Sequence, residues 1–329
     1  KVDERQKPPL QKKHSNLKPV QHRLFSLASI FDPMISYNPT DWFSILFRLH
    51  KSDTFRKLLP LMVLIGLYSA GIAWLELSYW KLSEKSHLRN LTVLHTLLGF
   101  AISMLLVFRT NTAYDRWWEG RKLWGSLVNN SRNLSMKLQH LLPIDATRER
   151  KAFRDLLPAF AMVLHRHLRK ETTRTELFEH ADWHPELQQL DSNKHIPNQV
   201  ATLIYKYINQ LYKAETISGE QLLYLNTELQ SLTDVCGACE RIKNTPIPFS
   251  YNVFIKKFIF IYIMTLPIGF VFQLGYWIVP IVVFVFYVLA SLELIAEEIE
   301  DPFGADANDV PTELIAQNIH KHTLEILHP

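Results

Sequence analysis

The stretch LTVLHTLLGFAISMLLVFRTNTAYDRWWEGRKLW, residues Leu91 to Trp124, decides the fold that we predict for this chain. Its first part, Leu91 to Phe108, contains no acidic residue, no Lys and no Arg. As a helix this part would cover about 27 Å, close to the hydrocarbon thickness of a bilayer. Arg109 ends it, and aromatic residues suited to the headgroup layer follow at Tyr114, Trp117 and Trp118. Neither Pro nor Gly occurs between Phe100 and Trp118, so one helix is expected to run from lipid into water.

Three bulky apolar residues recur every four positions in this stretch, which places them along one helix face: Phe100, Met104 and Phe108. The spacing alone favours contact with lipid or with another helix. A second interpretation is a line of apolar groups that faces a pore and closes it by dewetting. Because one copy cannot enclose a pore, this interpretation requires a symmetric ring of subunits.

The average composition does not indicate a membrane protein, but the distribution of apolar residues along the chain does. The 329 residues are 47% hydrophobic and 21% charged, and the mean hydropathy of -0.03 is that of a soluble protein. This average hides two strongly apolar blocks on either side of a polar middle. The net charge of +4 is too small to indicate nucleic-acid binding and fits a protein beside anionic lipid or one that handles anions.

The two cysteines, Cys236 and Cys239, form a CxxC pattern without a second pair, and we expect them to pack in a helix rather than act in redox or metal chemistry. No disulfide framework is present, so nothing indicates a secreted fold. The sequence begins at Lys1 rather than Met, and we expect that a preceding segment has been removed.

Five regions are predicted in chain order. Residues 1–52 form a basic tail and an amphipathic segment, 53–109 the first two membrane spans, 110–250 a helical extramembrane region, 251–297 the third and fourth spans, and 298–329 a turn and a final helix. The amphipathic segment Asp41–Leu49 is expected either on the membrane surface or docked on the protein itself. Four glutamates are expected to carry the fourth span into water: Glu293, Glu297, Glu298 and Glu300.

The spans follow from long apolar runs, and the extramembrane helices from a coarse reading of the polar region between and after them. The predicted spans are Leu58–Leu77, Leu91–Phe108, Asn252–Gly275 and Tyr276–Ile295, and the predicted extramembrane helices are Asn111–Leu142, Lys151–Lys170, Val200–Ala214, Gly219–Lys243 and Thr312–Leu327. No alternating strand pattern of useful length occurs. The predicted fold is therefore an all-α membrane protein with four transmembrane helices. Both termini and the middle region share one face, which the positive-inside rule places on the cytoplasm-equivalent side.

Three blocks then carry a resemblance: FRTNTAYDRWWEGRKLWG (Phe108–Gly125), CERIKNTPIPFSY (Cys239–Tyr251) and EIEDPFGADANDVP (Glu298–Pro311). In this order, and in register with four spans, they resemble the bestrophin family of anion channels, and most closely its plant and bacterial branch. The resemblance covers roughly Asp53 to the C-terminus. It implies a homopentamer with one axial pore, in the chloroplast thylakoid membrane for the plant branch, with the bulk of the protein and both termini on the stromal side.

The resemblance also assigns candidate site residues. The pore neck maps onto Phe100, Met104 and Phe108, and a second constriction onto Glu220, where many relatives carry an apolar residue. Five glutamates there would repel anions unless they were protonated or ion-paired. Arg109 and Arg116 are candidates for attracting anions, with pairing to Asp115 or Glu119 as the alternative for Arg116.

The third block corresponds to the acidic cluster that holds calcium in animal bestrophins. Asp306 and Asp309 match two of its carboxylates, but calcium needs six to eight oxygen ligands. The alternative is a capped turn before the last helix. No cofactor is implied; chloride is the transported ion, and calcium stays open.

The function that follows is a voltage-dependent, passive anion channel. It would conduct chloride, with nitrate and bromide as further permeant ions, and balance the charge of proton pumping across the thylakoid membrane. The alternatives are a bicarbonate pathway and a membrane-anchored scaffold that carries no current. An enzyme is not expected, because the sequence has no nucleophile motif and no phosphate loop. It also has no pair of metal ligands spaced to share one helix face.

Overall fold

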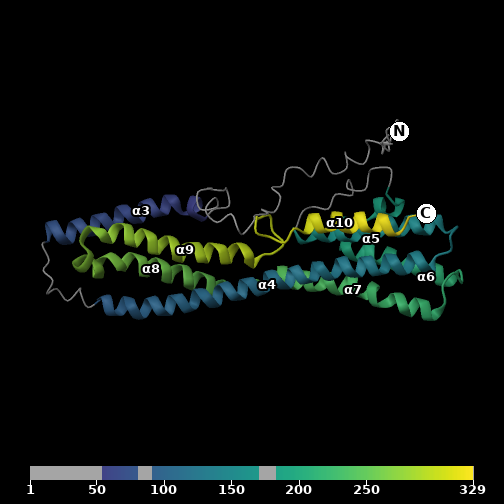
Figure 1. Ribbon diagram of the computed structural model, residues 1–329, viewed down its shortest axis with the longest axis horizontal. Coiled ribbons are helices and arrows are strands. Elements are labelled where there is room, and N and C mark those ends of the chain that lie inside the picture. Colours follow the sequence, from purple (N-terminus) through teal and green to yellow (C-terminus); the bar gives the residue numbers. More distant parts are fainter. Residues whose placement is uncertain (1–53, 81–90, 170–182, 329) are drawn as a thin grey trace, which may run out of the picture. The chain divides into compact units, whose positions relative to one another are not determined.

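The computed structural model describes residues 54–80, 91–169 and 183–328, and all regular elements within these ranges are helical (Figure 1). The predicted all-α fold is therefore confirmed for the described part of the chain. The basic tail and the amphipathic segment Asp41–Leu49 lie outside the described residues.

The first core is built from the apolar helices of the described residues. These are α3 (Thr54–Trp74), its π-helical continuation η2 (Leu75–Tyr79), the first part of α4 (Leu91–Leu141), α8 (Phe249–Leu274) and α9 (Ile278–Glu300). Ile102 and Leu106 of α4 lie in this core, each 1% exposed. Three stretches of the described chain are long and apolar enough to cross a membrane: Thr54–Tyr79, Leu91–Leu141 and Phe249–Glu300.

The third of these stretches contains two helices. The chain reverses at η6 (Gly275–Trp277), where Gly275 has a φ of +54°, a conformation that a residue without Cβ adopts at little cost. After the reversal α9 packs against α8 (Figure 1). Four apolar helices result, as the sequence predicts. The positions of the membrane boundaries stay a prediction.

The second core lies around the other half of α4. It is formed with α5 (Thr147–Leu168), α6 (Ile196–Lys213), α7 (Gly219–Asn244) and α10 (Thr312–Ile326), and a short 3-10 helix, η5 (Pro185–Gln189), precedes α6. Local signals fix these elements; Ser218 begins α7 with a capping box that it forms with Gln221. Apart from the ends, the helices agree with the predicted ranges.

The helix α4 belongs to both cores, because its 51 residues continue without a break from the apolar stretch into the polar one. At 1.5 Å per residue it is about 77 Å long. The prediction that one helix runs from the apolar into the charged part is confirmed.

The two cysteines pack as predicted. Cys236 and Cys239 are buried on α7 in the second core, with no disulfide. Burial away from water raises the pKa of the Cys236 thiol to about 12, because it disfavours the thiolate. Such a thiol is a poor nucleophile at neutral pH.

The prediction that four C-terminal glutamates of α9 extend into water is confirmed for Glu297, which is exposed and pairs with Lys256 at 2.8 Å, and is wrong for the other three. Glu293, Glu298 and Glu300 are buried, at 4%, 7% and 8% exposure, and do not extend into water. Each lies within 3.5 Å of a cation from a helix distant in the sequence, Lys57 of α3 for Glu298 and Arg109 of α4 for Glu293 and Glu300. These contacts arise only when α9 packs against α3 and α4.

Candidate functional site

The predicted stripe on α4 lies on the surface of the single chain. Phe100 is 70% exposed, Met104 45% and Phe108 57%, whereas Ile102 and Leu106 on the other side of the helix are buried. The buried side explains how α4 is held in the first core. The exposed side is left for lipid or for other protein molecules.

The size of these side chains makes their exposure informative. Contiguous apolar surface on a protein marks a site of interaction with protein or membrane. The same face of α4 continues toward the N-terminus with Val93 and Leu97, each 66% exposed. A stripe of this length requires a cover that the single chain does not supply among its described residues.

Arg109 follows the stripe directly, but it points into the protein. Its side chain has no exposed surface, and Nη2 donates to Glu300 Oε2 at 2.7 Å. Its Nε lies 3.5 Å from Glu293 Oε2. Because the guanidinium is buried and its charge is balanced by two carboxylates, the structure does not support the predicted anion-attracting role of Arg109.

Glu300 is the junction of this buried cluster. Besides Arg109, its carboxylate accepts the backbone N–H of Ile247 at 2.7 Å through Oε1. The Asn252 amide lies 3.5 Å from Oε2. The cluster thus connects α4, the α7–α8 turn, the start of α8 and the end of α9.

Arg116 lies two helix turns further along α4 and is also bound to the protein. Its guanidinium donates to the backbone carbonyls of Ile242 and Thr245 at 2.6 Å, and of Glu300 at 3.0 Å. The alternative of pairing with Asp115 or Glu119 is not what the structure shows, since Glu119 instead accepts from Arg241 at 2.7 Å. Arg116 therefore joins the end of α7 to the end of α9 through hydrogen bonds. Its guanidinium is occupied by these contacts and is not available to attract anions.

Glu220 lies in the first turn of α7, near the positive end of the helix dipole. Its Oε2 accepts from the Ser218 hydroxyl at 2.7 Å, and this hydrogen bond lowers the pKa of the Glu220 carboxyl below its ordinary value. One turn further, Leu223 and Tyr224 are 73% and 57% exposed. The predicted constriction therefore has two candidates on neighbouring turns, the charged Glu220 and the apolar Leu223. Its assignment to Glu220 stays a prediction.

The acidic turn after α9 is organised around Asp309, which is 6% exposed. Its Oδ2 accepts the backbone N–H of Asp306 at 2.8 Å. Burial raises the pKa of the Asp309 carboxyl to about 7. These contacts are those of the capped turn, the alternative to a calcium site; calcium binding by Asp306 and Asp309 stays a prediction.

The pairing of the buried glutamates was not predicted from the sequence. The signal was present in the spacing of Glu293 and Glu300, which are seven positions apart and so share one face of α9. An acidic pair on one face, together with a lone Arg at the end of an apolar helix, indicates a buried charge cluster. Which Arg would meet which Glu could not be read from that spacing.

Comparison with protein families gives one match over most of the chain. Residues 34–325 match the family model described as bacterial/fungal bestrophin protein. A voltage-dependent anion channel-forming protein of Nostoc sp. is 38% identical over 227 residues, which are 68% of this chain and 74% of the relative. A voltage-dependent anion channel-forming protein of Escherichia coli K12 is 31% identical over 285 residues, covering 87% of this chain and 91% of the relative.

The fold is similar to solved structures as well. The crystal structure of a bacterial bestrophin homologue from Klebsiella pneumoniae matches 83% of this chain and 100% of that chain, with a TM-score of 0.74 and 28% sequence identity. The similarity therefore extends over both helical cores described above.

Proposed function

Since this chain belongs to the bestrophin family, we propose that it conducts chloride passively through the central pore of a homopentamer. The chain is a membrane protein of a family that forms anion channels, and it is not an enzyme. The identity of the anion, the five-fold assembly and the pore-lining residues are the parts that we propose.

The single observation that carries the proposal is the exposed stripe of Phe100, Met104 and Phe108 on α4. Each protomer would contribute one stripe, and rotation about a shared axis would bring equivalent residues together as rings. The buried side of α4 is fixed in the first core, so the stripe has a defined orientation. Rings of Phe and Met side chains would form a narrow, apolar neck.

An apolar neck favours anions such as chloride over small cations for two reasons. Chloride is weakly hydrated, so it loses or deforms its water shell at lower cost, and a narrow apolar pore demands this loss. The edges of Phe rings are slightly positive and interact favourably with an anion. Because Arg109 and Arg116 are held in internal contacts, selectivity at the neck is proposed to need no fixed positive charge.

Control by voltage is part of the proposal, since the relatives from Nostoc sp. and Escherichia coli are named voltage-dependent. For the location we propose the thylakoid membrane, with the second core and the described C-terminus on the stromal side. The location rests on the resemblance of the sequence alone, as the relatives named above are bacterial. Immunoblotting of fractionated source membranes tests it, and recovery in another membrane would overturn it.

Reconstitution into planar bilayers tests the channel directly. With asymmetric chloride, the reversal potential should lie near the chloride equilibrium potential. A reversal potential set by bicarbonate would favour the bicarbonate pathway, and pentamers that carry no current would favour the scaffold.

The neck is tested by Phe100→Ala and Phe108→Ala, which should enlarge single-channel conductance and weaken closure. Leu67→Ala is the matched control, because Leu67 is an equally exposed apolar residue (68%) on α3. If both neck variants give the parent's single-channel records, α4 does not line the pore.

A further inference from the structure

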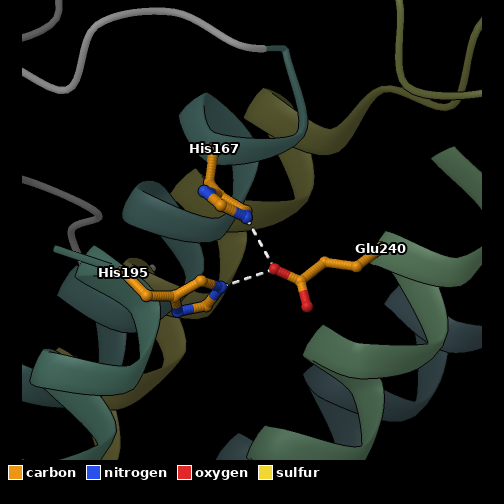
Figure 2. Close-up of side chains that lie close together, drawn as sticks. All are labelled: His167, His195 and Glu240. Atoms are coloured by element: carbon orange, nitrogen blue, oxygen red, sulfur yellow. Dashed lines mark hydrogen bonds and ion pairs between the residues drawn. The ribbon is translucent and has the colours of Figure 1, made fainter. Parts of the chain in front are cut away.

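Three side chains that are distant in the sequence meet between α5, α6 and α7: His167, His195 and Glu240 (Figure 2). His167 Nε2 lies 2.6 Å from Glu240 Oε1, and His195 Nε2 lies 2.5 Å from the same oxygen. The two imidazole rings face one another edge-on, with centroids 4.6 Å apart. Among the described residues, this is the one group of three or more metal-ligating side chains whose donor atoms lie within 4.8 Å of one another.

Local structure explains how each residue reaches this point. His167 lies in the last turn of α5, His195 is the N-cap of α6, and Glu240 lies in the last turns of α7. Periodicity on a single helix could not predict the group. His165, two positions from His167, points elsewhere and shares a hydrogen bond of 2.7 Å with the Thr312 hydroxyl in the α5–α10 contact.

We propose that His167, His195 and Glu240 form a binding site for one divalent transition-metal ion of the zinc class in each subunit. Two imidazole nitrogens and one carboxylate oxygen form the donor set that such borderline ions prefer. Three protein ligands leave a fourth position for water, as in zinc sites with an open coordination position. The proposal does not depend on ion conduction.

The geometry is close to that of a bound ion. In a tetrahedral site with bonds of about 2.0–2.1 Å, neighbouring donor atoms are about 3.3 Å apart. The two N–O distances of 2.5 and 2.6 Å would therefore widen by less than 1 Å on binding, which side-chain rotation can supply. All three side chains are about one-third exposed, at 33%, 32% and 28%, so an ion can reach the site from water.

The electrostatic environment favours a cation. Burial opposes ionisation of the Glu240 carboxyl, but the hydrogen bonds from the two histidines outweigh it and lower the pKa of this carboxyl below its ordinary value. In Figure 2 the second carboxylate oxygen of Glu240 points away from both rings, which leaves it available as an additional ligand.

Metal binding would have one defined structural consequence at α6. His195 Nδ1 now accepts the backbone N–H of Asn198 at 3.1 Å, so the proton of the neutral ring is on Nε2. An ion at Nε2 requires the other tautomer, with the proton on Nδ1. The Asn198 N–H would then be released to water, and α6 would exchange its N-cap bond for attachment through the ion to α5 and α7.

The test is titration of the full-length, detergent-solubilised and chelator-treated protein with Zn²⁺ in a calorimeter. The variants Glu240→Gln and His195→Gln keep side-chain volume and hydrogen-bonding capacity but remove one ligand each. The matched control is His140→Asn, an exposed histidine on α4 outside the group. We expect one more Zn²⁺ per subunit in the parent and the control than in the two ligand variants, or an affinity at least about tenfold weaker in those variants.

A second readout separates metal binding from a purely structural role of the hydrogen bonds. Zn²⁺ should raise the melting temperature of the parent and leave that of Glu240→Gln unchanged, because only a bound ion stabilises the native state by linkage. Co²⁺ in place of Zn²⁺ should give the intense visible absorption of a four-coordinate ion.

Equal Zn²⁺ affinity and stoichiometry in the parent and both ligand variants would overturn the proposal. If the variants do not fold, anomalous scattering at the zinc edge from parent crystals grown with Zn²⁺ decides the matter. Density between the three side chains supports the site, and its absence refutes it.

Discussion

Replacing Arg109 with Met is expected to destabilise the protein strongly, because it removes the cation from a buried charge cluster. The guanidinium has no exposed surface, and it balances Glu300 at 2.7 Å and Glu293 at 3.5 Å. Met has a similar length and fills much of the same space. The change therefore isolates the loss of charge from the creation of a cavity.

The expected loss of stability depends on the contacts that Glu293 and Glu300 keep when the guanidinium is removed. Removing one partner of a buried ion pair costs about 3–5 kcal/mol, because the other charge is left uncompensated. Glu300 keeps the N–H of Ile247 at 2.7 Å, and such a hydrogen bond to a charged group offsets part of the cost. We therefore expect about 3 kcal/mol, or a fall of about 6 °C in melting temperature at about 2 °C per kcal/mol for a chain of this size.

Thermal unfolding in detergent, followed by the loss of the folded-protein peak on size-exclusion chromatography, measures the change. Arg241→Met is the matched control, since Arg241 pairs with Glu119 on the surface, at 64% and 42% exposure. Exposed pairs contribute at most about 1 kcal/mol, so the control should shift by no more than about 2 °C. A melting temperature for Arg109→Met equal to that of the control would refute this reasoning. If such a variant also lost chloride conductance, the role in anion attraction would be restored.

Three further predictions concern other parts of the chain. Gly120→Ala should cost about 1–3 kcal/mol, because the new Cβ would lie 3.0 Å from Phe303 Cζ; Gly237→Ala, where nothing lies within 4 Å, should instead raise the melting temperature. If Glu220 lines the pore, Glu220→Gln should raise chloride conductance at neutral pH, where the lowered pKa keeps the parent carboxyl charged; unchanged conductance and selectivity in bilayers remove it from the pore. Asp309 has a folded-state pKa raised to about 7 from an ordinary value of 3.8, so the folded state binds more protons than the unfolded state between these values, and stability falls as pH rises through this window. Asp309→Asn should flatten that fall in melting curves recorded at successive pH values, and a fall as steep as the parent's would contradict the assignment.

The helices were the most predictable part of the structure. The continuous helix α4 followed from a stretch without Pro or Gly at the junction of its apolar and charged parts, and α7 (Gly219–Asn244) differs from its predicted range by one residue. These features depend on neighbours a few positions apart, which are all present in the sequence. The stripe of Phe100, Met104 and Phe108 was found for the same reason, since residues four apart share a helix face.

The charged residues were the least predictable part. Arg109 and Arg116 were expected to influence anions, and four glutamates at the end of α9 were expected in water, but the structure buries Arg109 against Glu300 and leaves only Glu297 of the four exposed. The sequence does not distinguish a charged side chain at the end of an apolar helix that extends into water from one that is buried in the protein. Only the position of a partner from another helix decides between the two, because an isolated buried charge is too costly to persist.

The amino-acid sequence by itself determined the class of this protein: four apolar helices, a polar helical region and three blocks typical of one family of anion channels. The tertiary structure decided which side chains meet, in particular the cluster around Glu300 and the group of His167, His195 and Glu240. The physical reason is the range of the forces involved. Periodicity and capping act within one or two turns of a helix, whereas ion pairs and metal sites join residues that come together only after separate helices have packed.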